Sequence, residues 1–241
     1  MCRIIIHVKL ERAHIEVDGI QVEVVRKDIK NLNLSVRPPD GGVRVSAPRR
    51  FSDAQIRRVI VQRLGWIRRK KSAILKRRPP RPEYVSGESL MFRGERCVLC
   101  VSEREAAPSV RILDGRRLEL TVRPGADRAR REAVLHGWYR RSLKEQIPDL
   151  IAKWEPEMGV SVAEWRIKRM KTRWGSCNAR DRRVWLNLEL AKRSPRCLEY
   201  VLVHEMVHLL ERRHSARFHD LMDSFLPDWR LYKDELNQVS L

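Results

Sequence analysis

Residues 204–214 read His204-Glu205-Met206-Val207-His208-Leu209-Leu210-Glu211-Arg212-Arg213-His214, the pattern H-E-x-x-H with a third histidine six positions later. On a helix of about 3.6 residues per turn, His204 and His208 lie about 40° apart, so both imidazoles can bind one metal ion. Glu205 lies about 100° round from His204 and can flank the metal without binding it. The stretch therefore predicts a zinc site with Glu205 as the general base.

His214 needs a separate argument, because a continuous helix would turn it roughly 80° away from the face of His204. Ser215 is suited to cap a new helix, which predicts that the first helix ends near Arg213 and that His214 turns back at the junction. Glu211 shares the face of His204 but lies roughly 10 Å further along the axis, too far for a common ion. We therefore expect the three histidines to hold one zinc ion.

Composition sets the class of protein. With 42% hydrophobic and 34% charged residues, the chain of 241 residues is expected to be globular rather than disordered. Its 51 Lys and Arg against 31 acidic residues give a net charge of +20, which makes contact with a nucleotide or nucleic acid through a basic surface worth testing. The apolar run within residues 1–9 is too short for a secretory signal, and no stretch is apolar enough to cross a membrane. We therefore expect a cytoplasmic protein without membrane association.

Five cysteines without a regular spacing indicate reduced thiols. The pattern Cys97-Val98-Leu99-Cys100 lies in an alternating apolar segment, so packing in a strand explains it better than metal binding or redox chemistry.

The first part of the chain favours strands. Residues 14–48 alternate apolar and polar side chains between glycine turns, which predicts antiparallel hairpins. Ser52 is suited to cap one long helix over about 52–77, and the proline-rich run over about 76–83 predicts an extended linker. Residues 84–123 return to strand patterns.

The second part carries the metal site. A second long helix follows Pro124-Gly125, and two strand-like runs, 162–167 and 184–188, predict an antiparallel hairpin before the metal-binding helix. The expected fold is α+β: a β-rich N-terminal region with one long helix over residues 1–123, followed by a domain over 124–241 that carries the metal site.

A faint internal repeat is also visible. Val36-Arg37 with Asp40-Gly41 and Gly65-Trp66 resembles Val110-Arg111 with Asp114-Gly115 and Gly137-Trp138, at offsets of 74 and 72 residues. It hints at two strand-strand-helix units rather than a solenoid.

Several motifs resemble those of the YgjP family of predicted metal-dependent hydrolases, which is related to SprT-type and gluzincin-like metallopeptidases. They are Lys171-Thr172-Arg173-Trp174-Gly175-Ser176-Cys177, Val184-Trp185-Leu186-Asn187, Tyr200-Val201-Leu202-Val203-His204-Glu205, His214-Ser215 and Phe218. The resemblance is specific over roughly residues 165–226. It implies a zincin-like metallopeptidase domain in which His204, His208 and His214 hold zinc and Glu205 is the catalytic base.

The resemblance also implies that the Arg173–Cys177 loop lies near the site, with Arg173 and Trp174 as candidate substrate-binding residues. The alternative is a packed turn with Trp174 in the core, and the sequence leaves both open.

The leading hypothesis is a zinc metallopeptidase that cleaves peptide or protein substrates by a Glu-activated, zinc-bound water. Two alternatives keep the same metal site. One is a nucleoside triphosphate pyrophosphatase, for which the positive charge is suited, and the other is a basic, DNA-associated SprT-like protease or binding protein.

Overall fold

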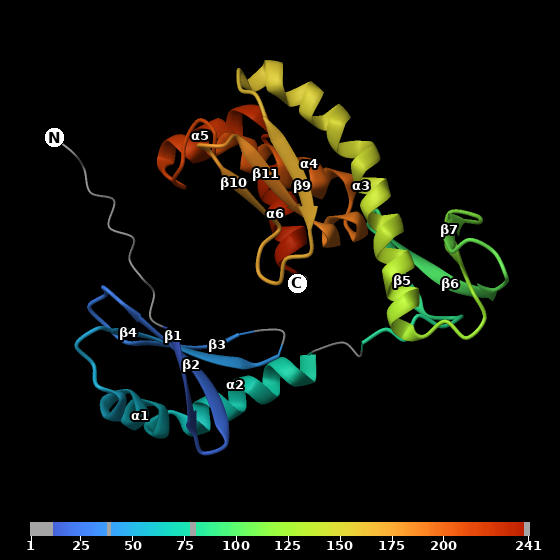
Figure 1. The fold of residues 1–241 in the computed structure, drawn as a ribbon. Helices are drawn as coiled ribbons and strands as arrows, with labels where there is room; N and C mark the ends of the chain where they lie inside the picture. Colours follow the sequence, from blue (N-terminus) through green and yellow to red (C-terminus); the bar gives the residue numbers. More distant parts are fainter. Residues whose placement is uncertain (1–11, 38–39, 78–80, 239–241) are drawn as a thin grey trace. The chain divides into compact units, whose positions relative to one another are not determined.

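The chain consists of two compact units, Met1–Pro80 and Arg81–Leu241. The computed structural model describes residues 12–37, 40–77 and 81–238 (Figure 1). The predicted N-terminal segment 1–9 and the central residues of the predicted linker lie outside the described residues. Among the described residues, no helix is both long and apolar enough to cross a membrane.

The first unit contains a four-stranded sheet in the order β1-β2-β4-β3. Its strands are β1 (Arg12–Val17), β2 (Ile20–Lys27), β3 (Asn33–Arg37) and β4 (Gly42–Pro48). Asp18 and Gly19, both with positive φ, join β1 to β2 in a tight antiparallel hairpin, and β3 pairs antiparallel with β4. The prediction of antiparallel hairpins holds for these two pairs, but β2 and β4 are parallel.

Two helices cover this sheet where the sequence predicted one. They are α1 (Asp53–Gln62) and α2 (Leu64–Arg77). Ser52 caps α1 as predicted, in a capping box with Gln55. At Arg63 the backbone N–H bonds to Ile60 O, three residues back instead of four, and this tighter turn ends α1. Ile56, Ile60 and Ile67 from both helices are buried in the core of the unit.

The second unit begins with a sheet of the same design. Its strands are β5 (Ser89–Phe92), β6 (Glu95–Glu103), β7 (Ser109–Ile112) and β8 (Arg117–Val122). Their order is β5-β6-β8-β7, with a parallel β6–β8 pair between two antiparallel pairs, as in the first unit. The faint repeat in the sequence thus coincides with two sheets of the same strand order and pairing. Cys97 and Cys100 lie in β6, both free, as the strand interpretation of that motif expects.

The long helix α3 (Arg128–Met158) follows, capped by Asp127. It packs on β7 and β8 and also on α4, so it joins the β5–β8 sheet to the rest of the unit (Figure 1). One core contains side chains from Tyr84 to Leu236. The unit boundary therefore lies at Pro80 and not at residue 123, because the strands before residue 123 share their core with the helices after it.

A third sheet lies next to the helix that carries His204 and His208. Its strands are β9 (Glu164–Lys168), β10 (Gly175–Asn178) and β11 (Arg183–Asn187), in the order β10-β11-β9. The two runs that were predicted to form a hairpin are β9 and β11, and they are parallel. The antiparallel partner of β11 is β10, which comes from the predicted loop between them. Three helices complete the unit: α4 (Pro195–Val207), α5 (Ala216–Phe225) and α6 (Trp229–Asn237).

Candidate metal centre

Helix α4 carries the first half of the site. It begins at Pro195 after Ser194, where the missing N–H of proline costs no hydrogen bond. Apolar residues on nearly all its sides are buried, so α4 is held firmly in the core. The helix ends at Val207, earlier than the predicted end near Arg213. His208 is its C-cap and keeps right-handed helical geometry, with φ −65° and ψ −12°.

The three-histidine centre consists of His204, His208 and His214. One ring nitrogen from each lies within 4.8 Å of the others, and Nε2 of His204 is 3.1 Å from Nε2 of His214. A tetrahedral zinc ion with bonds of about 2.0–2.1 Å holds its ligand nitrogens about 3.3 Å apart. The chain therefore brings the three predicted histidines together at a spacing that fits one ion of this size.

His208 is oriented by the loop that follows α4. Its Nδ1 lies 3.0 Å from the main-chain oxygen of Glu211, to which it donates a hydrogen bond. This bond fixes the proton on Nδ1 and leaves the lone pair of Nε2 for a metal. The carboxylate of Glu211 accepts from the backbone N–H of Arg213 at 3.0 Å. The main-chain carbonyl of Glu211 thus orients His208, whereas its side chain binds the backbone of Arg213 and not the three-histidine centre.

Phe218 packs against all three imidazoles. It lies on α5, where Ser215 caps the helix as predicted, and it is almost fully buried. Its ring centroid is 4.9, 4.8 and 4.7 Å from those of His204, His208 and His214, respectively. Because Nδ1 of His204 has no hydrogen-bond partner among the described residues, packing sets the orientation of that ring. Phe218 belongs to the motifs quoted from the sequence, but the motif alone does not show that its ring contacts the three imidazoles.

The surroundings keep two imidazoles neutral. Burial lowers the pKa of His204 to about 3, and the neighbouring histidines add to this effect. Burial and the charge of His208 also lower the pKa of His214. A neutral imidazole offers the lone pair that a metal requires, so both side chains are in the binding form at neutral pH.

Glu205 lies in a tight space between α4 and the edge of the third sheet. It is 6% exposed, and burial raises its pKa to about 8 while the positive charge of Arg173 acts in the opposite direction. A Cβ atom on Gly175 would come within 2.6 Å of Glu205 Oε1 and 2.9 Å of Val201 Cγ1. Only a glycine therefore allows β10 to approach the carboxylate this closely. The sequence motif contains this glycine, but its role is visible only in three dimensions.

A cleft of about 850 Å³ opens over the three-histidine centre and Glu205. One wall is β10, and the others come from α4 and the loop after it. Three arginines line this cleft: Arg173, Arg180 and Arg212. Among them, the sequence predicts a role in substrate binding only for Arg173.

The two candidate substrate-binding residues lie in different surroundings. Arg173 lines the cleft, whereas Trp174 packs against the core under the guanidinium of Arg193. The loop that holds them is clamped by buried Asn187, whose Nδ2 donates to Met170 O at 2.9 Å and to Arg173 O at 2.7 Å. Asn187 belongs to a quoted motif, but its type alone gave no sign of this clamp.

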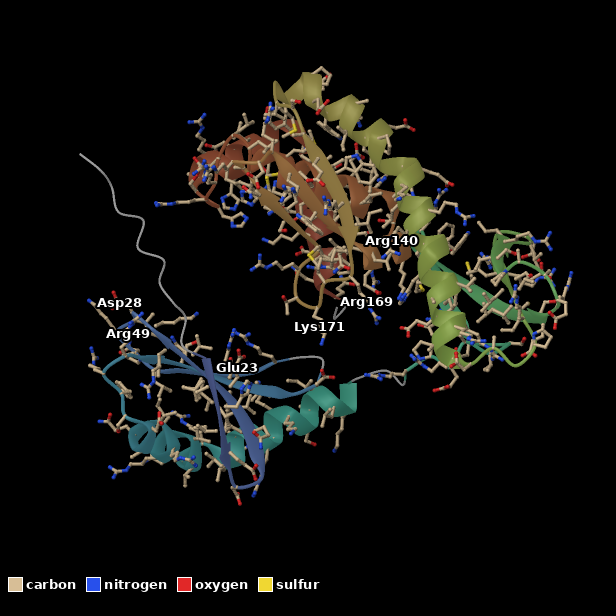
Figure 2. All side chains as sticks on the ribbon, in the orientation of Figure 1. Glu23, Asp28, Arg49, Arg140, Arg169 and Lys171 are labelled. Atoms are coloured by element: carbon tan, nitrogen blue, oxygen red, sulfur yellow. The ribbon has the colours of Figure 1, made fainter. Side chains whose placement is uncertain are left out.

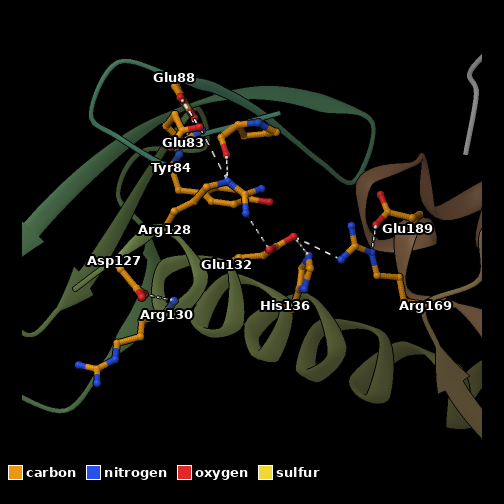
Figure 3. A network of polar contacts seen from close by, with 11 residues as sticks. Glu83, Tyr84, Glu88, Asp127, Arg128, Arg130, Glu132, His136, Arg169 and Glu189 are labelled. Atoms are coloured by element: carbon orange, nitrogen blue, oxygen red, sulfur yellow. Dashed lines mark hydrogen bonds and ion pairs between the residues drawn. The ribbon is translucent and has the colours of Figure 1, made fainter. Parts of the chain in front are cut away.

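An ion pair attaches the start of the same loop to α3. Arg169, labelled with Lys171 in Figure 2, reaches Glu132 at 3.3 Å and Glu189 at 4.0 Å. Figure 3 shows that Glu132 also binds Arg128 at 3.3 Å and lies 3.8 Å from His136. The network joins the start of the β9–β10 loop to α3, so the loop is anchored at both of its ends.

Comparisons with known proteins identify the family of the chain. The family model described as YgjP-like, metallopeptidase domain matches residues 30–239. No curated protein matches the chain significantly. A solved structure similar to part of it is that of the metallopeptidase zymogen of Pyrococcus abyssi abylysin. That similarity has 19% sequence identity and a TM-score of 0.35 over 37% of this chain and 90% of that chain, too distant to support further argument. The family match spans most of the chain, including the whole three-histidine centre, and the protein therefore belongs to the YgjP-like metallopeptidase family.

Proposed function

We propose that this protein is a zinc-dependent peptidase in which Glu205 is the catalytic base. The observation that carries the proposal is the gathering of three imidazole nitrogens within 4.8 Å of one another, beside a buried carboxylate on the same helix. Three nitrogen ligands with a fourth position open toward a cleft are the donor set of catalytic zinc sites.

His204, His208 and His214 would hold the ion. When bound, zinc supplies Lewis-acid chemistry: it lowers the pKa of water toward 7 and polarises a carbonyl group. Two features of the chain suit this role. The hydrogen bond from His208 to Glu211 O directs one ring nitrogen to the ion, and Phe218 keeps the three rings in place.

Glu205 is suited to move the proton. Its carboxylate would take the proton of the attacking water and deliver it to the departing amine of the peptide. A base works best when its pKa is near the working pH, and burial moves that of Glu205 in this direction.

The edge of the third sheet is suited to hold the substrate. Among the described residues β10 pairs only with β11, and all four of its residues line the cleft. An extended peptide can add to such an edge through main-chain hydrogen bonds, which would place a peptide bond beside Glu205.

The nucleotide alternative has one observation in its favour, which is the set of three arginines lining the cleft, because guanidinium groups also bind phosphates. The edge strand favours a peptide, since a triphosphate makes no use of a row of backbone donors and acceptors.

The test combines metal analysis with a substrate screen. The purified chain is expected to bind one zinc ion and to cleave peptides. Glu205→Gln should keep the zinc and lose hydrolysis by roughly a thousandfold or more, as loss of a general base predicts. His204→Ala should lose the metal.

Two outcomes would contradict the proposal. If zinc-loaded Glu205→Gln hydrolysed peptides as fast as wild type, Glu205 would not be the catalytic base. Pyrophosphate release from nucleoside triphosphates without any peptide cleavage would replace the peptidase by the alternative.

A further inference from the structure

The cleft over the three-histidine centre has an unbalanced charge. Arg173, Arg180 and Arg212 line it, and the only carboxylate in the lining is the buried Glu205. Among the described residues, none of the three guanidinium groups forms an ion pair. Two arginines of the adjacent sheet are different, because Arg166 and Arg183 share the carboxylate of Glu164. The charges of Arg180 and Arg212 are therefore available to a ligand, and that of Arg173 acts on Glu205 without forming an ion pair with it.

Hydrogen bonds hold the main chain at Arg173 and Arg180 and directly before Arg212. Asn187 binds the carbonyl of Arg173 at 2.7 Å. The side chain of Asn178 accepts from the backbone N–H of Arg180 at 3.1 Å, in the turn after β10. Arg212 follows Glu211, whose carbonyl is bound by the ring of His208. Fixed attachment points lower the entropy that is lost when a side chain binds a ligand.

Two of the arginines flank the strand along which a peptide would bind. Arg173 precedes the edge strand β10 and Arg180 follows it, so they stand near its two ends. Neighbouring residues of a strand rise about 3.3 Å, so the four residues of β10 between these two positions span about 10 Å, the length of three or four residues of extended peptide. Arg212 lies on the loop after α4 and belongs to the lining of the same cleft.

We propose that Arg173, Arg180 and Arg212 make this cleft selective for peptides with aspartate or glutamate side chains within a few residues of the cleaved bond. The proposal rests on the peptidase function proposed above and specifies its substrate class. A guanidinium matches a carboxylate by two parallel hydrogen bonds, and three arginines would bind acidic side chains on both sides of Glu205.

The charge of the whole chain acts in the same direction. A net charge of +20 attracts acidic peptides and repels basic ones before contact. Long-range attraction alone would not depend on which arginines are removed, so the two contributions can be separated by comparing variants of equal charge.

The experiment uses the zinc-loaded full chain and a proteome-derived peptide mixture, with cleaved bonds identified by mass spectrometry. Wild type is expected to cleave bonds that have Asp or Glu within about three residues. The triple variant Arg173→Gln, Arg180→Gln, Arg212→Gln should lose this enrichment. The matched control, Arg96→Gln with Arg116→Gln and Arg123→Gln, removes the same charge from exposed arginines outside the cleft and should keep it.

A second measurement uses matched peptides that differ only by Glu or Gln beside a cleaved bond. Wild type should prefer the Glu peptide in kcat/KM, and each single arginine variant should reduce that preference by up to about fivefold, as expected for a solvent-exposed ion pair. Added salt should weaken it as well. Zinc content and melting temperature of each variant show that the centre and the fold are intact.

The outcomes separate the two proposals. The substrate assignment would be wrong if wild type cleaved peptides without an acidic preference, or if the triple cleft variant kept that preference. In either case the proposed peptidase function would still hold. Absence of any peptide cleavage by zinc-loaded wild type would overturn both, and triphosphate hydrolysis that the cleft variant loses would assign the arginines to phosphate instead.

Discussion

Gly175 determines how closely the edge strand β10 can approach the carboxylate of Glu205. A methyl group added there would lie 2.6 Å from Oε1 and 2.7 Å from Cγ of Glu205. Gly175→Ala must therefore displace β10 or the carboxylate. We expect kcat/KM to fall by about a hundredfold, the effect of a shift of about 1 Å in a reacting group, with the zinc content unchanged. Overpacking should also lower the free energy of unfolding by about 1–3 kcal/mol.

Gly137→Ala is the matched control. An added Cβ at this position of α3 would meet no atom within 4 Å. The substitution should leave kcat/KM unchanged and stabilise the chain by up to about 1 kcal/mol, because alanine favours a helix interior over glycine. Equal activities of the two variants in the peptide assay would show that contact between β10 and Glu205 is unimportant.

At this scale the sequence predicts groups that act through their chemistry. His204, His208 and His214 follow a spacing typical of a metal site, and the structure brings their ring nitrogens together in a cleft that Glu205 also lines. Gly175 and Phe218 act through shape, by an absent side chain and by a flat ring. Residue type alone does not distinguish such roles from ordinary packing.

At the scale of elements, a metal would connect two helices that the chain itself joins only by an irregular segment. His208 is the C-cap of α4, and His214 stands two residues before α5. Removal of the metal by a chelator is expected to lower the melting temperature and to speed amide hydrogen exchange in residues 208–225, with little change in α3. Zinc at a thousand times its dissociation constant would contribute about 4 kcal/mol.

His214→Ala provides the comparison for that measurement. With one ligand lost, zinc should raise the melting temperature of this variant much less than that of wild type. A chelator that leaves hydrogen exchange of residues 208–225 unchanged in zinc-loaded wild type would rule out a link between α4 and α5 through the metal.

The sequence predicts elements well where the signal is local. The caps Ser52 and Ser215 lie where expected, because each binds a backbone N–H three residues ahead. The parallel pairs β2–β4 and β9–β11 were not predicted, because parallel strands are joined by long crossovers that leave no turn motif. The short strand β10 was read as loop, since its four residues show no apolar alternation.

At the scale of the whole molecule, the division into units at Pro80 has a direct test. The first unit has its own buried core, so residues 1–80 expressed alone should fold with a stability of about 3–5 kcal/mol, typical of a small core. Residues 81–241 should fold as well and bind zinc. Circular dichroism and urea unfolding measure both.

Residues 124–241 are the informative control. This fragment lacks β5–β8, which share one core with α3 and α4, and it should fail to fold cooperatively. If it folds and binds zinc while residues 81–241 gain nothing in stability, the boundary would lie at 123 after all. Strand patterns show that a segment is β, but they do not show which core it joins, so the sequence placed this boundary incorrectly.

The repeated sheet design also affects how the chain can acquire its structure. A chain diluted from denaturant presents both hairpins, β1–β2 and β5–β6, and both of their parallel partners, β4 and β8, at the same moment. A chain leaving the ribosome presents β1–β4 first, so its sheet can close before any competing strand exists. Synthesis from the N-terminus thus favours the correct pairing of β2 with β4, which the matching strand orders of the two sheets do not by themselves ensure.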